Sequence, residues 1–423
     1  MSLFARLAAG TMALLVLGAC ASAHPCLLSE RRNHRTRLSK LGSAPKLDAT
    51  VLTEPRSDAE RVEFTSDGLS LFGYVMKPAG DGPFPAVLYG HSAFNLRDFD
   101  MDNAKELSRN GFVVFIPAWR AENGNPGVYE LWYGELDDAV AALSYLRSLP
   151  IVDPERVYAA GHSAGGTLAL LLAEIDSGLR GVATSGAPLS VVGASWPVPF
   201  DVHDSQEACL RSPSQHVQEL TAPVALFYGD HGEQAMLRVA ARMAASAPGK
   251  ITVTAVANAD HGTAMGLAIP QIVVFFQQQG AVERDRACTS AAATLVTCGL
   301  GPEWVAACRS NPVYERCLAA AGDDCTAVAT CGWESWSGSA CGGAEVETGT
   351  TGCVETSSCF GTCGADVACQ CGCATEMAPA AAVGVTIMGE CWAQHCASAA
   401  TQDAADCFQK NCSTSYQQVC VGH

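Results

Sequence analysis

The sequence predicts an α/β fold over residues 60 to 283, a mostly parallel, doubly wound sheet covered by helices, followed by a small cysteine-rich domain over residues 288 to 423. Short apolar segments alternate with segments whose apolar residues recur at helical spacing, as at Val140, Leu143 and Leu146. Such alternation is typical of parallel sheets, because each connecting helix returns across a face of the sheet. Cysteines are rare before residue 288 and frequent after it. About 220 residues suffice to bury one core in the first domain.

The predicted α/β domain begins with an edge hairpin. Residues 61–65 and 69–76 alternate apolar and polar side chains on either side of a Ser-Asp-Gly turn. The strands expected after it are, in order, residues 86–89, 112–116, 157–160, 181–184, 224–228 and 251–256. A last helix from Gly262 to Gln279 closes the domain, and a charged linker at residues 283–286 separates it from the tail.

Residues 1–23 are predicted to be an export signal rather than part of the fold. Arg6 precedes an apolar stretch that is too short to span a bilayer, and small residues at 21–23 offer a cleavage site. Residues 17–20 also resemble a bacterial lipobox, in which Cys20 carries the lipid. Both interpretations predict a secreted, periplasmic or outer-surface protein, and the second adds attachment of the N-terminus to a membrane or cell surface.

Residues 24–59 are predicted to form a polar, basic arm. Their basic residues include Arg31, Arg32, Arg35, Arg37 and Lys40, in a chain whose formal net charge is −17. Nucleic-acid binding requires a basic surface, so we do not expect a nucleic-acid partner.

The 21 cysteines favour an oxidising compartment, since such a number is hard to keep reduced in a cytosol. Only Cys20, Cys26 and Cys209 precede residue 288. Once Cys20 is removed or lipidated, the number of remaining cysteines is even. Cys26 can then pair with Cys209, although the sequence does not establish the connectivity.

The tail from Cys288 is acidic and has few large apolar residues, so we expect a helical unit that depends on disulfides. The motif Cys369-x-Cys371-x-Cys373 can bind a metal, but disulfides are favoured outside the cytosol. We therefore predict neither a metal nor another cofactor. A stalk, an adhesion module and a glycan-binding module all fit this tail.

The chemistry is predicted to centre on Gly161-His162-Ser163-Ala164-Gly165, which lies between an apolar strand and an apolar helix. This is the context of a G-x-S-x-G nucleophile elbow, in which glycines leave room for a tight turn. A plain Gly/Ser turn is the alternative interpretation.

The region around this motif resembles the α/β-hydrolases, specifically the branch of dienelactone hydrolases and prolyl-oligopeptidase catalytic domains. The resemblance extends over residues 84–91, 110–117, 136–138 and 146–157, which lead into the elbow. It implies the chain order nucleophile, acid, histidine. His261, in Asn258-Ala259-Asp260-His261-Gly262 after the last strand, is then the base that activates Ser163.

The acid departs from the family pattern. Relatives carry an aspartate three or four residues after the glycine that ends the preceding strand, and here those positions hold Gly232 and Glu233. We expect Glu233 to serve, with Asp230 as the alternative.

The resemblance also implies an oxyanion hole and a substrate pocket. The backbone N–H groups of Ala164 and Ala93 are the expected donors, although Ser92 replaces the glycine that relatives carry before the second one. We expect Phe94 to form a wall of the acyl pocket. Trp196 lies in the segment 187–221, where relatives insert a small lid, and it either lines the pocket or packs in the core.

The sequence thus predicts an exported serine hydrolase that cleaves a small or polymeric carboxylic ester. A serine nucleophile argues against a dienelactone substrate, because true dienelactone hydrolases use cysteine. A prolyl-oligopeptidase-type peptidase is the alternative, and we expect it less because fewer than 60 residues precede the domain, where those enzymes carry a propeller. A non-catalytic adhesion scaffold is the alternative from another class, motivated by Gly232 at the usual acid position.

Overall fold

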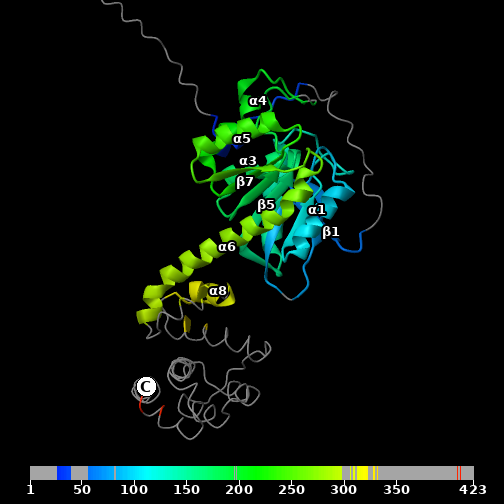
Figure 1. Cartoon of the computed structure of the whole chain (residues 1–423). Coiled ribbons are helices and arrows are strands. Elements are labelled where there is room, and N and C mark those ends of the chain that lie inside the picture. The colour runs from blue at the N-terminus through cyan, green and yellow to red at the C-terminus, as the bar shows by residue number, and fades with distance from the viewer. Residues whose placement is uncertain are drawn as a thin grey trace, which may run out of the picture. The chain divides into compact units, whose positions relative to one another are not determined.

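A computed structural model describes residues 26–39, 56–80, 82–194, 196 and 198–297, and in the C-terminal part residues 305, 308, 309, 312–322, 327, 328, 331, 407 and 410. The predicted export signal with Cys20, the end of the basic arm and the Cys369–Cys373 motif lie outside these residues. The chain divides into two compact units, Met1–Val273 and Val274–His423, which are described separately (Figure 1).

The first unit contains an eight-stranded sheet in the order β1-β2-β4-β3-β5-β6-β7-β8. The strands are β1 (Glu60–Ser66), β2 (Leu69–Met76), β3 (Phe84–Gly90), β4 (Val113–Pro117), β5 (Val152–His162), β6 (Val182–Ser185), β7 (Val224–Gly229) and β8 (Ile251–Val256). The edge strands β1 and β2 pair antiparallel, β2 pairs antiparallel with β4, and the strands from β4 to β8 run parallel. The predicted fold class is confirmed.

Helices cover the sheet (Figure 1). They are α1 (Asp98–Arg109), α2 (Gly134–Ser148), α3 (Ala164–Ile175), the short α4 (Ser205–Cys209) and α5 (Gln234–Ser246), with 3-10 turns η1 (Leu28–Asn33), η3 (Pro213–Gln215) and η4 (Val217–Glu219). Helix α6 (Ala264–Thr297) begins in this unit and continues past Val273 into the second. Helix α3 is mostly apolar and almost entirely buried, because it follows the central strand β5 into the core. Among the described helices, none is long and apolar enough to cross a membrane.

Helix α6 differs from the expected arrangement. It continues to Thr297, so the charged segment 283–286 is helical and does not interrupt the chain as a linker would. Glutamate and arginine have high helix propensities, and their charges remain compatible with an exposed helical turn.

In the second unit, the described residues include helix α8 (Pro312–Ala321) and two disulfides, Cys288–Cys308 and Cys317–Cys331. A small core contains Cys288, Leu295, Cys308, Leu318, Val328 and Cys331. Half of these core side chains are cysteines, as expected for a unit that cannot bury a large apolar core.

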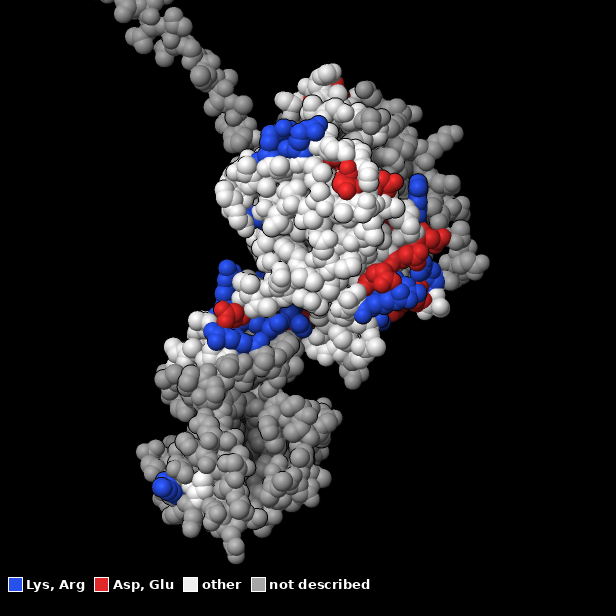
Figure 2. Space-filling view, in the orientation of Figure 1, with Lys and Arg blue, Asp and Glu red and all other residues white. Residues whose placement is uncertain are grey.

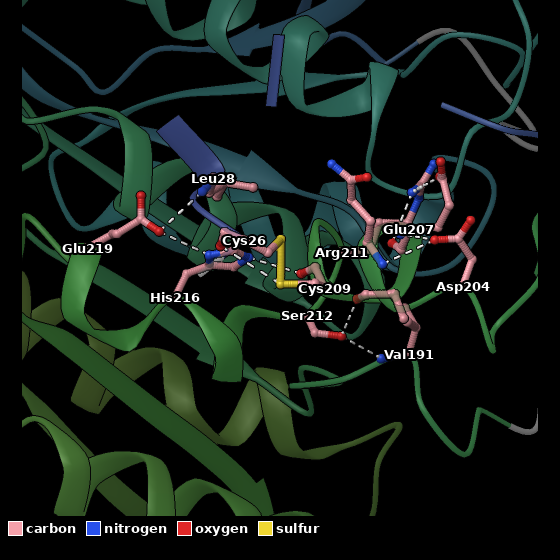
Figure 3. The surroundings of a disulfide bond; sticks show 12 residues. Cys26, Leu28, Val191, Asp204, Glu207, Cys209, Arg211, Ser212, His216 and Glu219 are labelled. Carbon is pink, nitrogen blue, oxygen red and sulfur yellow. Dashed lines mark hydrogen bonds and ion pairs between the residues drawn. A yellow bond between two sulfur atoms is a disulfide. The ribbon is translucent and has the colours of Figure 1, made fainter. Parts of the chain in front are cut away.

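A third disulfide lies in the first unit. Cys26 pairs with Cys209 across a sequence separation of 183 residues (Figure 3). The pairing that the sequence left open is therefore formed. On the face drawn in Figure 2, basic and acidic side chains lie in small interspersed groups among uncharged residues.

Candidate active site

Ser163 lies between the end of β5 and the first residue of α3, in a strained backbone conformation with φ 52° and ψ −119°. Positive φ costs a non-glycine residue about 1–3 kcal/mol, which the surrounding structure must offset. A Cβ on Gly161 would lie 2.5 Å from the backbone of Gly165, and one on Gly165 would lie 2.2 Å from the backbone of Gly90. Only glycine fits on either side of the serine, so the predicted elbow is present.

The structure brings Ser163, His261 and Glu233 together. The Nε2 atom of His261 lies 3.0 Å from Ser163 Oγ, and its Nδ1 lies 2.7 Å from Glu233 Oε1. Because Nδ1 faces a carboxylate, it carries the proton, and Nε2 keeps the lone pair that accepts the proton of Ser163. The side chain of Glu233 is 4% exposed, and its other oxygen accepts the Gly229 N–H at 2.5 Å, which orients the carboxylate.

Asp230, the alternative acid, is not brought to the histidine. Its carboxylate accepts the backbone N–H groups of Asn258 (3.0 Å) and Ala259 (3.2 Å) and lies 2.9 Å from His231 Nδ1. These bonds, first of all the one from Asn258, hold the pKa of Asp230 below its usual value. The chain leaves β7 at this point, so the Asp230 side chain points to the loop before His261 and shapes that loop instead.

Two backbone donors are available for an oxyanion hole. Ala164 is the first residue of α3, where an N–H has no acceptor within the helix. Ser163 N–H donates to Ser185 O at 2.8 Å and Ser92 N–H donates to Asp100 Oδ1 at 2.8 Å, so neither is free. The next N–H in the loop after β3 is that of Ala93, the predicted donor. Ser92 is accommodated by its contact with Asp100, and the positive φ of this loop falls on Phe94 (φ 53°).

Known proteins are similar to this chain in sequence or in fold. A model of the prolyl oligopeptidase family matches residues 98–271. The "Uncharacterized peptidase YtmA" of Bacillus subtilis is 23% identical over 191 residues, which cover 41% of this chain and 74% of that protein. The "Probable 2-oxo-3-(5-oxofuran-2-ylidene)propanoate lactonase" of Bradyrhizobium is 24% identical over 180 residues, 40% of this chain and 68% of that protein. The acylaminoacyl peptidase structure of Pyrococcus horikoshii is 14% identical, with a TM-score of 0.45, and matches 52% of this chain but only 41% of that one.

The first unit is therefore a serine hydrolase of the α/β-hydrolase superfamily. Within this hydrolase, Gly186 after β6 is a site residue that the sequence did not reveal. Its φ is 64°, and a Cβ there would lie 2.8 Å from Nδ1 of His261 and 3.1 Å from Oε1 of Glu233. The contact between histidine and acid therefore requires glycine at this position. A glycine after a buried strand is a common pattern, and only the folded structure shows what it faces.

His162 was likewise not assigned a role from the sequence. Its Nε2–H donates to the backbone carbonyl of His261 at 2.7 Å, and the two imidazole rings lie 4.9 Å apart. Burial lowers the pKa of His162 to about 4, so this ring is neutral near pH 7. It therefore positions the loop of His261 without placing a second positive charge beside the imidazolium that forms during catalysis.

A recess of about 20 Å³ lies next to Ala164 of the hydrolase. It is lined by His91, Phe94, Trp119, Glu122, Tyr129, Trp132, Glu135, Ala164, Gly165 and Leu168. Phe94 is a wall of this recess, where its ring packs edge-on against Tyr129 at 5.6 Å. Trp196 packs edge-on against Trp132 at 6.5 Å and is not among the residues that line the recess. The recess has room for about one water-sized group.

Polar side chains also line the recess, which the sequence did not indicate. The hydroxyl of Tyr129 and Oε2 of Glu135 have no hydrogen-bond partner among the described residues. Burial raises the pKa of Glu135 to about 8, so this carboxyl is largely protonated near neutral pH. His91 and Glu122 lie 2.9 Å apart as a buried pair. His91 follows β3, Glu122 and Tyr129 lie between β4 and α2, and Glu135 is in the first turn of α2. Their positions follow no motif spacing, so no sequence pattern could have grouped them.

Proposed function

We propose that the hydrolase cleaves carboxylic esters with a small acyl group. The observation that carries this proposal is the recess beside Ala164, the residue after the nucleophile, which leaves room for about one water-sized group. The methyl group of an acetyl ester fits such a space, whereas the side chains of most amino-acid residues do not. The similarity to a protein named as a lactonase also supports ester chemistry.

In this mechanism Ser163 attacks the ester carbonyl while Nε2 of His261 takes its proton, over the 3.0 Å between the two atoms. Glu233 stabilises the resulting imidazolium, and the N–H groups of Ala164 and Ala93 stabilise the oxyanion. The imidazolium then protonates the departing alcohol, which leaves an acyl group on Ser163. Water, deprotonated by His261, then attacks this acyl-enzyme. The bond between Ser163 Oγ and the acyl group breaks, the carboxylic acid leaves, and His261 returns the proton to Ser163 Oγ.

A peptidase is the second candidate function, and the family model together with the Bacillus relative favours it. Rates on p-nitrophenyl acetate and on peptide p-nitroanilides separate the two. The ester is intrinsically more reactive than an anilide, and the rates of the same two compounds with free imidazole measure this difference. We expect the ratio of kcat/KM between ester and anilide to exceed the ratio of these two reference rates. If the enzyme instead accelerates a peptide anilide more than the ester, each relative to its rate with free imidazole, the peptidase is the better assignment. The alternative of a non-catalytic adhesion scaffold was based on Gly232 at the usual acid position. That argument no longer holds, because Glu233 supplies the acid that contacts His261.

We further propose that the protein is exported, that its N-terminus attaches to a membrane or cell surface, and that the tail contacts a surface, a glycan or a polymeric ester. The disulfides Cys26–Cys209, Cys288–Cys308 and Cys317–Cys331 support an oxidising compartment. Cell fractionation tests the location, and the proposal fails if the protein stays in the cytosol with reduced thiols.

Removal of residues 287–423 tests the role of the tail. It should abolish retention on an insoluble polymer and preserve hydrolysis of p-nitrophenyl acetate.

A further inference from the structure

The described part of the N-terminal arm, residues 26–39, packs on the segment between β6 and β7, residues 186–220, here called the insert. The disulfide Cys26–Cys209 joins the two segments (Figure 3). Next to it, the backbone N–H groups of Leu28 and Ser29 donate to the carboxylate of Glu219 at 3.1 and 3.3 Å. Because Leu28 is fully buried, this part of the arm belongs to the folded unit.

Glu207 of the insert binds the arm a second time. Its side chain is 0% exposed and accepts hydrogen bonds from His34 Nε2 (2.6 Å), Thr36 Oγ1 (2.8 Å) and the backbone N–H of Arg37 (2.9 Å). Burial opposes ionisation of this carboxyl, but these bonds and the Arg211 guanidinium lower its pKa to about 2. Glu207 is therefore a buried carboxylate whose partners come largely from the arm.

Arg211 connects the arm and Glu207 to the substrate recess. Its guanidinium is fully buried, lies 2.7 Å from Glu207 and donates to Thr36 Oγ1 at 2.7 Å. On its other side, Nε donates to the backbone carbonyl of Glu130 at 2.9 Å, and the guanidinium lies over the ring of Tyr133 at 5.1 Å. Its planar set of five donors lets one side chain bind the arm, the insert and the loop of Glu130 at once.

That loop, residues 129–133, is here called the pocket loop because Tyr129 and Trp132 line the recess. Leu131 and Trp132 have φ values of 49° and 66°, so two successive non-glycine residues adopt the left-handed conformation. Such a conformation persists only where neighbouring groups enforce it. The arm does so directly as well, since Tyr133 Oη donates to Arg31 O at 2.8 Å and Arg31 Nη1 donates to Tyr133 O at 3.2 Å.

We propose that Arg211 is a positioning residue, held by the N-terminal arm, which keeps the pocket loop strained and the recess small and thereby sets the preference for short acyl groups. The inference rests on the proposed function, because it deepens the substrate preference of the same site. It predicts that loosening the arm widens the recess, lowers KM for esters of longer acids and leaves the chemistry on acetate intact. A merely structural role would instead lower activity on all substrates in parallel.

The test compares kcat and KM for p-nitrophenyl acetate and p-nitrophenyl octanoate in the full chain. Thr36→Val removes the hydroxyl that binds Arg211 and Glu207, and Cys26→Ser/Cys209→Ser removes the covalent link. The matched controls are Thr252→Val, on the remote strand β8, and Cys317→Ser/Cys331→Ser, in the second unit. We expect the acetate-to-octanoate ratio of kcat/KM to fall about threefold to tenfold in either arm variant, the change expected from loss of one or two net hydrogen bonds. Both controls should keep the wild-type ratio, and kcat on acetate should stay within about twofold.

The inference is wrong if the arm variants fold, react with a fluorophosphonate at the wild-type rate and keep the wild-type ratio. If one variant fails to fold, the other decides, since each breaks a different contact. Failure of the proposed function looks different: the wild-type protein would then cleave anilides and no ester. In that case alanine and phenylalanine p-nitroanilides replace the two esters, and an unchanged ratio between them in the arm variants overturns the role of Arg211.

Discussion

The assignment of Glu233 as the triad acid can be tested by Glu233→Gln. One oxygen of Glu233 accepts the Gly229 N–H, so the carbonyl oxygen of a glutamine would keep that bond and its amide would face Nδ1 of His261. An amide N–H there requires an unprotonated Nδ1, which moves the ring proton to Nε2. Nε2, 3.0 Å from Ser163 Oγ, then cannot accept the serine proton. We expect kcat to fall by about 10⁴-fold, the loss that the wrong tautomer causes in serine-protease triads, or about 5.4 kcal/mol in the barrier.

The assay is the steady-state hydrolysis of p-nitrophenyl acetate, with thermal unfolding as a check that the variant is folded. Asp230→Asn is the matched control, because it makes the same change three residues earlier. Its side chain keeps one oxygen as an acceptor for the N–H groups of Asn258 or Ala259, and we expect less than about a tenfold loss. A larger loss for Asp230→Asn than for Glu233→Gln would refute the reasoning and show that Asp230 orients His261.

Two further predictions concern Gly186 and Glu207. Gly186→Ala should lower kcat by about 10²-fold or more, because its Cβ would lie 2.8 Å from His261 Nδ1 and displace the ring. The control Gly193→Ala, also at positive φ (81°) but with no atom within 4 Å, should retain activity. Equal losses of kcat in the two variants would assign the effect to backbone strain alone. Glu207, whose pKa is about 2 in the folded protein against an ordinary value of 4.5, stabilises the fold above pH 4.5 and loses this contribution as the pH falls towards 2. The free energy of unfolding, measured with urea, should therefore change less between pH 3 and pH 5 in Glu207→Gln than in the wild type. An equal change in both proteins would contradict the buried carboxylate.

Local patterns in the sequence were sufficient for the parallel sheet and for two of the three triad residues. The Gly161–Gly165 motif specifies its own turn, since glycines on both sides of Ser163 are needed wherever that turn forms. His261 follows the last strand at a position that the family resemblance indicates. The choice between Glu233 and Asp230 remained open because spacing along the chain does not state where a side chain points after a strand ends.

The remaining site residues depend on contacts between distant segments. Gly186 matters only because His261 and Glu233 lie against it, and neither is near it in sequence. The arm was predicted only as polar and basic, yet Arg31 is buried beside Tyr133 and Asp137, more than 100 residues away. A basic residue in an acidic chain can be solvated or paired in the interior, and composition alone does not distinguish these cases.

The most direct test of the central claim is the intact mass of the protein after reaction with a fluorophosphonate, followed by peptide mapping. The proton-accepting contact from His261 to Ser163 predicts one adduct, located on Ser163 and absent from Ser163→Ala, with a labelling rate that falls in Glu233→Gln. A folded wild-type protein that stays unlabelled, or that carries the adduct on another residue, would contradict the assignment of Ser163 as the nucleophile of a serine hydrolase.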